Sequence, residues 1–175
     1  WVAMNAFNQA ALTFTGQNVG AGRYTRINKI ALTAGSCEFT VGLVCGIGVF
    51  LLYNPLLGIY SNSPDVIAAG HVRLLYVCAP YFLGGLMDCI VGPIRGMGAS
   101  ITPTVISLLG SCVLRLVWVA TIFQIPEFRT PETLYISYPI SWALTFAAHF
   151  VFYIILRRKF PKQDAVPASA AAAAV

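Results

Sequence analysis

Charged residues are scarce in this sequence: they make up 10% of the 175 residues, and only six of them are Asp or Glu. Soluble domains carry roughly 25% charged residues, so this chain cannot cover itself with an ordinary aqueous surface. The apolar share of 58% and the mean hydropathy of +0.75 exclude a disordered chain as well. The composition favours an integral membrane protein.

Catalytic and metal-binding patterns are also missing. The sequence contains neither GxSxG nor HExxH, and its five cysteines fall in apolar stretches without a CxxC pair. These absences argue against a membrane-embedded enzyme, a metal site and a disulfide framework. We therefore expect no enzymatic activity and no cofactor, and we expect the cysteines to act as small packing residues.

Apolar stretches alternate with short polar breaks along the chain. A transmembrane helix needs about 20 apolar residues, so stretches of that length predict membrane-spanning helices. The predicted spans are about 1–15, 30–53, 68–94, 103–123 and 136–156. The first span is short and no leader-like segment precedes it, so we expect the sequence to begin inside a longer polypeptide. Residues 1–162 are then one transmembrane bundle, and the alanine-rich residues 163–175 are expected to be a disordered tail.

The Lys and Arg residues predict the orientation. Only Arg73 and Arg129 lie on one side of the predicted spans, and Arg115 lies inside a span. The other eight lie on the opposite side: Arg23, Arg26, Lys29, Arg95, Arg157, Arg158, Lys159 and Lys162. The positive-inside rule places this second side, and with it the C-terminus, in the cytoplasm. The net charge of +5 is therefore explained by topology, and no basic stretch interleaved with aromatic residues predicts nucleic-acid binding.

Three spans carry polar side chains at intervals of about four residues, which places each set on one helix face. Polar groups in hydrocarbon need partners or water, so we expect the three stripes to face one another around a hydrated cavity. The alternative is that they only form hydrogen bonds between helices. The stripes are Asn5, Gln9, Thr13 and Gln17; Thr104, Ser107, Ser111 and Arg115; and Ser137, Ser141, Thr145, His149 and Tyr153.

The stretch 68–94 contains an acid, Asp88, between Pro80 and Pro93. Both prolines remove a backbone donor and are expected to bend or interrupt the helix. Broken helices that carry an intramembrane acid are typical of transporter binding sites. Asp88 also shares a predicted face with glycines, which let another helix approach closely; these are Gly84, Gly92 and Gly96. The alternative for Asp88 is a buried ion pair with Arg95 or Arg115.

Glu38 is a second acid inside a span, on a face that Gly42 and Gly46 continue. It is either a functional acid or a packed structural carboxylate. His149 titrates near neutral pH when unperturbed, and its alternative is a hydrogen-bonded core residue. The candidate ion-coupling and substrate residues are therefore Asp88, Glu38, His149, Arg115 and Tyr81.

Two glycine motifs resemble those of a known family. The first, from Gln17 through Gly20 and Gly22 to Arg23, resembles the loop after the eighth helix of multidrug and toxic compound extrusion (MATE) transporters. The second, Ile94-Arg95-Gly96-Met97-Gly98-Ala99-Ser100, resembles the family's RGxG turn between helices ten and eleven. Residues 135–142 resemble the start of the twelfth helix in bacterial members. The chain is thus similar to helices eight to twelve of such a transporter.

This resemblance implies an all-α integral membrane protein, a transmembrane helix bundle belonging to a two-lobe, twelve-helix fold whose N-terminal lobe lies outside this sequence. It implies an antiporter of the inner cell membrane that exports organic, often cationic or amphipathic, drugs in exchange for H+ or Na+ by alternating access. Asp88 matches the helix-ten acid of many members, and it would be the ligand if the ion is Na+. The alternatives are a lipid-linked saccharide flippase of the same superfamily and a non-transporting structural membrane subunit.

Overall fold

The computed structural model describes residues 2–59 and 63–165, and the elements in this part of the chain are helices. Four continuous helical segments are long and apolar enough to cross a membrane: Tyr24–Leu51, Pro64–Gly96, Ile101–Gln124 and Pro131–Arg157. The helices are α1 (Val2–Gly20), α2 (Ile27–Leu51), α3 (Tyr53–Gly58), α4 (Pro64–Arg73), α5 (Tyr81–Cys89), α6 (Val91–Gly96), α7 (Ile101–Ser107), α8 (Leu114–Ala120) and α9 (Pro131–Arg157). Short 3-10 turns lie at Tyr24–Arg26, Ile122–Gln124 and Pro126–Phe128, and π-helical turns at Leu74–Cys78 and Leu108–Val113.

These helices confirm the expected all-α membrane fold, although the first helix is longer than the sequence suggested. The sequence predicts its end at about residue 15, where Gly16, Gln17 and Asn18 follow, but α1 continues to Gly20. The Asn18 amide is accommodated inside the helix because its Nδ2 donates to the Phe14 carbonyl, 2.8 Å away. The chain turns only at Gly22, whose φ of 69° lies in the left-handed region that favours glycine.

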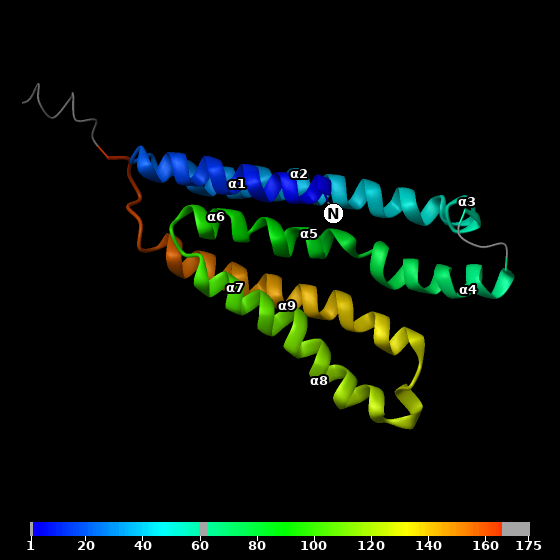
Figure 1. The fold of residues 1–175 in the computed structure, drawn as a ribbon. Helices are drawn as coiled ribbons and strands as arrows, with labels where there is room; N and C mark the ends of the chain where they lie inside the picture. The colour runs from blue at the N-terminus through cyan, green and yellow to red at the C-terminus, as the bar shows by residue number, and fades with distance from the viewer. Residues whose placement is uncertain (1, 60–62, 166–175) are drawn as a thin grey trace, which may run out of the picture.

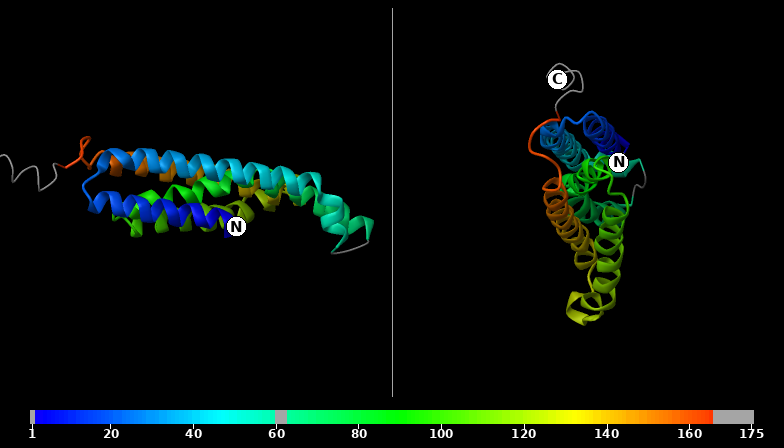
Figure 2. Two further views of the ribbon diagram at one scale, coloured as in Figure 1. Left: turned by 90° about the horizontal axis from the view of Figure 1, so that it is seen from above. Right: turned by 90° about the vertical axis from the view of Figure 1, so that its left-hand side faces the viewer.

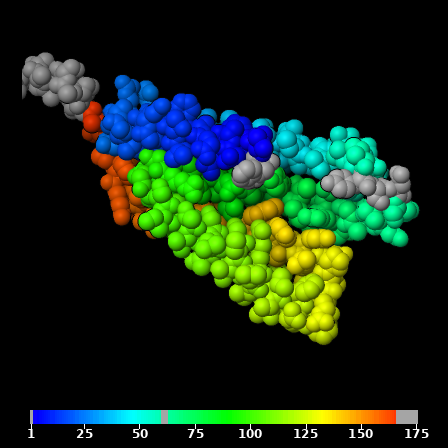
Figure 3. All heavy atoms as spheres, in the orientation of Figure 1, coloured from blue at the N-terminus to red at the C-terminus, as the bar shows by residue number. Residues whose placement is uncertain are grey.

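The helices form a bundle with α5 and α6 in its middle layer (Figures 1 and 2). On one side of this layer, α6 packs against α1 and α5 packs against α2. On the other side, α5 packs against α9, and α9 in turn packs against α7 and α8. Helices α1, α2, α6, α7 and α9 come together at one end of the bundle (Figure 1), which carries the eight Lys and Arg residues that the sequence places together and is called the basic end below. At the opposite end α4 and α8 diverge, with part of α9 visible between them (Figure 3).

Among the described residues, buried apolar side chains form a cluster at the basic end, around Ile27, Ile94, Met97 and Tyr153. Several other helix contacts are made at glycines. A Cβ atom on Gly92 of α6 would lie 2.5 Å from the Asn8 carbonyl oxygen of α1, and one on Gly46 of α2 would lie 2.7 Å from the Cys78 carbonyl. These helix backbones therefore touch, as glycine faces allow in membrane bundles.

Pro80 and Pro93 interrupt the helical segment Pro64–Gly96, as the sequence predicts. Helix α5 ends at Cys89 because Pro93, four residues later, has no N–H to donate to the Cys89 carbonyl. Before Pro80 the backbone widens into a π-helical turn in which the Ala79 N–H donates to the Leu74 carbonyl over 3.1 Å. Helix α5 is thus a nine-residue segment with an irregular connection at each end.

The end of the described chain closes over the loop between α1 and α2. The Asp164 carboxylate accepts hydrogen bonds from the Thr25 backbone N–H over 2.9 Å and from the Thr25 hydroxyl over 3.0 Å. The Ala165 N–H donates to the Gly22 carbonyl over 2.8 Å. Asp164 and Ala165 belong to the expected disordered tail, and the remaining residues of that tail, 166–175, lie outside the described residues.

The contact at Gly92 predicts a large effect of a small substitution. Gly92→Ala places a methyl group against the Asn8 carbonyl and the Ala11 side chain, and overpacking of this kind costs about 1–3 kcal/mol. We expect a lower melting temperature for the full-length protein in detergent. Gly48→Ala is the control, since nothing lies within 4 Å of a Cβ at Gly48. Equal melting temperatures for the two variants would contradict the close approach of α6 to α1.

The Asp164 contact predicts a pH dependence. The Thr25 backbone N–H holds the pKa of Asp164 below its ordinary value, helped by the Thr25 hydroxyl and by the charges of Arg23 and Arg26. A carboxyl group with a lowered pKa stabilises the docked state at all pH values above its ordinary pKa. The contact is then lost as the pH falls through the lowered pKa. Hydrogen exchange at the Ala165 amide, corrected for intrinsic rates, measures this; Asp164→Asn should expose the amide at neutral pH too.

Candidate functional site

Asp88 is half-buried near the end of α5, one residue before the helix ends. The glycines expected on its face do meet other helices, but not the same one. A Cβ at Gly84 would lie 3.3 Å from the indole ring of Trp142 in α9, whereas a Cβ at Gly92 or Gly96 would meet the backbone of α1. The break after Cys89 changes the register between α5 and α6. Asp88 therefore lies between the glycine that contacts α9 and the glycines that contact α1.

Asn8 of α1 supports this break. Its side-chain Nδ2 donates a hydrogen bond of 2.6 Å to the backbone carbonyl of Asp88. Sequence reasoning missed Asn8 because it followed the stripe that contains Asn5 and Gln9. The available signal was the seven-residue spacing of Asn8 and Thr15, two polar residues on the face that α1 buries.

The two arginines considered as partners of Asp88 have contacts of their own. Arg95, at the end of α6, donates from Nη2 to the Thr104 hydroxyl over 3.2 Å. Arg115, in α8, donates from Nε to the Ser141 hydroxyl of α9 over 2.9 Å. Arg95 thus links the end of α6 to the start of α7.

Arg115 lies in an aromatic cluster. Its guanidinium carbon is 4.1 Å from the centre of the Tyr138 ring and 5.8 Å from that of Trp142, a geometry in which the ring faces attract the cation. Tyr81 meets Trp142 edge to face, with 5.9 Å between the ring centres. The structure therefore brings two of the predicted residues, Arg115 and Tyr81, next to the same tryptophan.

Glu38 is fully buried where α2 meets α1 and α5, with 0% of its surface exposed. Neither carboxylate oxygen has a hydrogen-bond partner among the described residues. A Cβ at Gly85 of α5 would lie 2.9 Å from Glu38 Oε1 and 3.2 Å from the Met4 sulfur, so only a glycine leaves room for this acid. The glycine face expected for Glu38 is also present, because Gly42 and Gly46 of α2 are buried too.

His149 is fully buried in α9 and contacts α7. Its Nε2 lies 3.1 Å from the Pro103 carbonyl and 3.4 Å from the Ser107 hydroxyl, while Nδ1 has no partner among the described residues. A carbonyl can only accept, so Nε2 carries the proton in this arrangement. His149 matches the hydrogen-bonded core residue, which was the alternative given for it.

The polar stripe of α9 is buried, and the stripe of α7 and α8 meets it. Ser107 reaches His149, Arg115 reaches Ser141, and Gly110 in the π-helical turn packs directly on Thr145. The hydroxyls of α9 mostly bond within their own helix: Ser137 to Leu134, Ser141 to Tyr138 and Thr145 to Ser141. These contacts fit the alternative of packed, hydrogen-bonded helices better than the expected hydrated cavity.

The stripe of α1 does not join the other two, which corrects the expectation of three facing stripes. Gln9, Thr13 and Gln17 are exposed, because α1 buries a different face. That face consists of Met4, Asn8, Ala11 and Thr15.

The cysteines also depart from expectation: only Cys89 is buried, and Cys37, Cys45 and Cys112 face outward.

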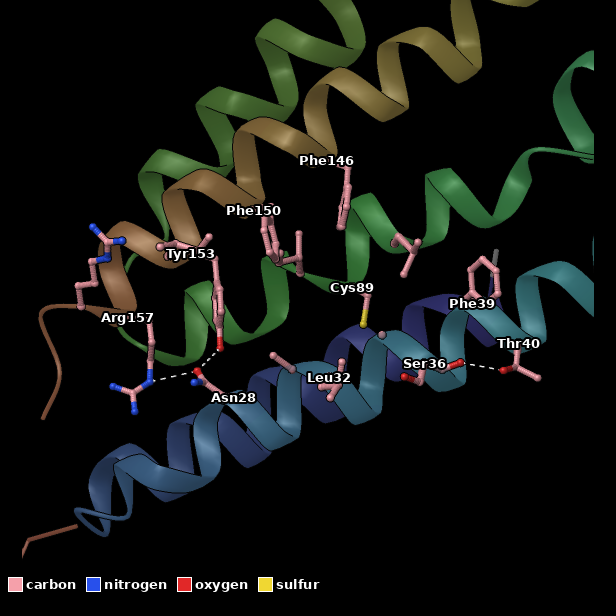
Figure 4. A pocket seen from close by; sticks show the side chains of 16 residues that line it. Asn28, Leu32, Ser36, Phe39, Thr40, Cys89, Phe146, Phe150, Tyr153 and Arg157 are labelled. Atoms are coloured by element: carbon pink, nitrogen blue, oxygen red, sulfur yellow. Dashed lines mark hydrogen bonds between the residues drawn. The ribbon is translucent and has the colours of Figure 1, made fainter. Parts of the chain in front are cut away.

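An elongated groove of about 710 Å³ runs between α2, α5 and α9 (Figure 4). Its walls are largely apolar, with Leu32, Phe39, Phe146 and Phe150 among the lining residues, and Cys89 points toward α2 from the α5 side. At its basic end Asn28 accepts hydrogen bonds from Tyr153 over 2.8 Å and from Arg157 over 3.2 Å. A second, smaller groove of about 420 Å³ lies between α1 and α2.

The motif glycines build the connections at the basic end. Gly22 and Gly98 are the described residues with left-handed φ angles, 69° and 93°. A Cβ at Gly96 would lie 2.8 Å from the Leu12 carbonyl, so this glycine permits the contact of α6 with α1. The Gln17 carbonyl accepts from the Ala21 N–H, and nothing lies within 4 Å of a Cβ at Gly20.

The family resemblance implies that Asp88 would be a ligand of the ion if that ion is Na+. Within residues 2–59 and 63–165, no group of three or more His, Cys, Asp and Glu side chains comes together in the way that metal sites require. The site contains two acids at the short helix α5. Asp88 is part of α5, and Glu38 of α2 contacts it at Gly85.

Comparison with known proteins identifies a family. The family model described as MatE matches residues 1–121, more than half of the chain. A curated relative, "Probable multidrug resistance protein YoeA" of Bacillus subtilis (strain 168), is 21% identical over 155 residues, which are 86% of this chain and 32% of that protein. The chain thus spans about a third of the length of that relative. No solved structure gives a significant match.

The hydrogen bond from Asn8 to the Asp88 carbonyl is expected to stabilise the interruption between α5 and α6. Asn8→Ala removes the donor and leaves the carbonyl without it, which costs about 1–3 kcal/mol when the group is buried. We expect faster hydrogen exchange across residues 88–94 and a lower melting temperature. Gln9→Ala is the matched control, since Gln9 is the exposed neighbour on the same helix. Unchanged exchange in Asn8→Ala would show that the break is held by other contacts.

Proposed function

Because the chain belongs to the MatE family of membrane transporters, we propose that it acts as part of an antiporter that exports organic compounds while a cation moves inward. The observation that carries this proposal is the position of Asp88, an intramembrane acid directly before the break of the segment Pro64–Gly96. Acids inside membrane spans are costly and generally mark ion or substrate pathways. Interrupted helices at mid-membrane form such sites in secondary transporters.

Transport itself is proposed for the whole protein. The chain spans 32% of the length of its curated relative, so that relative contains about twice as much further sequence. Alternating access in transporters built of repeats requires two bundles that move against each other around a central site. We propose that the bundle described here is one of the two.

An acid such as Asp88 supports exchange by a simple competition. Its charge must be neutralised before it can remain in a low-dielectric interior, by a bound cation or by a partner. A cationic compound and an inward-moving ion that neutralise the same charge exclude each other. The irregular connections at both ends of α5 give the segment that carries Asp88 points at which it can bend.

We propose organic, often cationic and amphipathic, compounds as substrates. The relative is named as a multidrug resistance protein, which supports this class. The cluster of Tyr81, Tyr138 and Trp142 supports it as well, since aromatic faces attract cations and the rings of Tyr138 and Trp142 already contact the guanidinium of Arg115.

We propose that the protein lies in the cell membrane with the basic end toward the cytoplasm. The support is the separation of Lys and Arg, because eight of the eleven belong to the basic end. Asp164, which closes over the loop at Thr25, lies at this end, so the C-terminal residues would be cytoplasmic too.

Asp88→Asn tests this proposal in the full-length transporter. The amide keeps the size and hydrogen-bonding capacity of the side chain but has no charge to exchange. We expect normal membrane insertion, retained or slightly weakened drug binding and at least a tenfold loss of ion-driven dye efflux from proteoliposomes, a loss that corresponds to about 1.4 kcal/mol or more.

Asp65→Asn is the matched control, because Asp65 is exposed in the first turn of α4 at the end remote from the basic loops. It should retain full efflux. Ion-coupled efflux at the wild-type rate by Asp88→Asn would refute the assignment of Asp88.

A further inference from the structure

Glu38 differs from every other acid in the chain. Four of the six acids are exposed and Asp88 is half-buried, whereas Glu38 has 0% of its surface exposed and both oxygens without a hydrogen-bond partner among the described residues. It lies about the middle of α2, eleven residues after the helix begins at Ile27. A buried polar group that is left unpaired destabilises the fold, so its presence calls for an explanation.

The neighbours of Glu38 supply no positive charge. Helices α1 and α5, which enclose it, contain no Lys, Arg or His. The titratable groups that face it are all on α5: the Cys89 thiol, the Asp88 carboxyl and the Tyr81 hydroxyl. Each of these becomes negative or stays neutral, so none of them can balance a negative charge on Glu38.

The neighbours also do not suit a metal cation. Sodium, magnesium and calcium are hard cations that take several oxygen ligands. Around Glu38 the structure places the Met4 thioether, the Cys89 thiol and the bare Cα of Gly85. Sulfur is a poor ligand for such cations, and the Cys89 thiol is only a weak hydrogen-bond donor.

We propose that Glu38 is a proton-binding site: it is a neutral carboxylic acid in the conformation described here and releases its proton when α5 moves away from α2. An isolated carboxylate in an apolar interior takes up a proton instead of remaining ionised. The proposal rests on the proposed function and deepens it, since it names the proton as the ion that this bundle exchanges.

Release of the proton requires water to reach Glu38, and the structure shows which contact stands in the way. Gly85 and Cys89 cover the acid from α5, a nine-residue segment between the π-helical turn at Leu74–Cys78 and the break before Val91. The same segment carries Asp88. A cationic compound that binds at Asp88 and shifts α5 would therefore uncover Glu38, which links substrate binding to proton release.

The first measurement is the protonation state itself. Infrared spectroscopy of the purified full-length transporter at pH 7 detects the C=O stretch of a protonated carboxylic acid. We expect Glu38→Gln to remove one such band and Glu132→Gln, at the exposed start of α9, to leave it unchanged. Identical bands in the wild type and in Glu38→Gln would overturn the proposal, whether or not the protein transports drugs.

The second measurement is proton release when an organic cation binds. Tetraphenylphosphonium is added to the wild type and to Glu38→Gln in weakly buffered detergent, and the pH change is recorded. We expect the variant to release about one proton fewer per transporter, because the amide has no proton to give. Equal release, or efflux that a sodium gradient drives without any proton movement, would overturn the proposal.

Glu38→Met provides the same test if the glutamine variant fails to fold, since methionine fills a similar volume and leaves no polar atom unpaired. We expect a higher melting temperature than that of the wild type, together with the same loss of proton release. A Glu38→Met variant that released as many protons as the wild type would overturn the proposal. Absence of drug efflux in the wild type, with the Glu38 band present, would instead count against the proposed transport function alone.

Discussion

The break in the helical segment Pro64–Gly96 is the constraint on which the rest of the bundle depends. Pro93 deprives the Cys89 carbonyl of its donor, and a membrane offers no water to replace it. Neighbouring backbone groups must therefore be satisfied by other helices, and Asn8 of α1 meets this need at Asp88 over 2.6 Å. That bond is possible only because Gly92 and Gly96 let α1 approach to backbone contact. Proline, asparagine and glycines on two helices thus form one unit.

The hydrocarbon surroundings of the helices also explain why the molecule has so small an apolar core. In hydrocarbon, burying a leucine against another helix removes no water, so apolar side chains gain little by turning inward. Large apolar residues such as Leu32, Val44 and Leu116 accordingly lie on the outside. The inside is left to glycines, to the hydroxyls of α9 and to the few side chains that have a chemical reason to be there. Among the described residues, Thr15 and Glu38 are buried with side-chain oxygens that no hydrogen bond explains, and of these two only Glu38 is ionisable.

Sequence reasoning recovered the features that depend on local pattern. The all-α membrane fold, the interruptions at the two prolines, the glycine face around Glu38 and the shared face of Ser137 to Tyr153 follow from composition and four-residue spacing. It did not recover the orientation of α1, because both Asn5-Gln9-Thr13 and Asn8-Thr15 are polar stripes and only packing decides which one is buried. The π-helical turn at Leu108–Val113 was also missed, since nothing in its sequence marks the contact of Gly110 with Thr145.

In the mechanism that we propose, the two intramembrane acids Asp88 and Glu38 have different tasks. Asp88 is half-buried, whereas Glu38 is fully buried and is covered by Gly85 and Cys89 of the same short helix. With a second acid under α5, movement of that one helix can admit a cation at Asp88 and discharge a proton at Glu38 together. The Glu38 carboxylate that remains is then charged and has no cationic neighbour, so the water that the movement of α5 admits is what makes this state accessible in an otherwise low-dielectric interior.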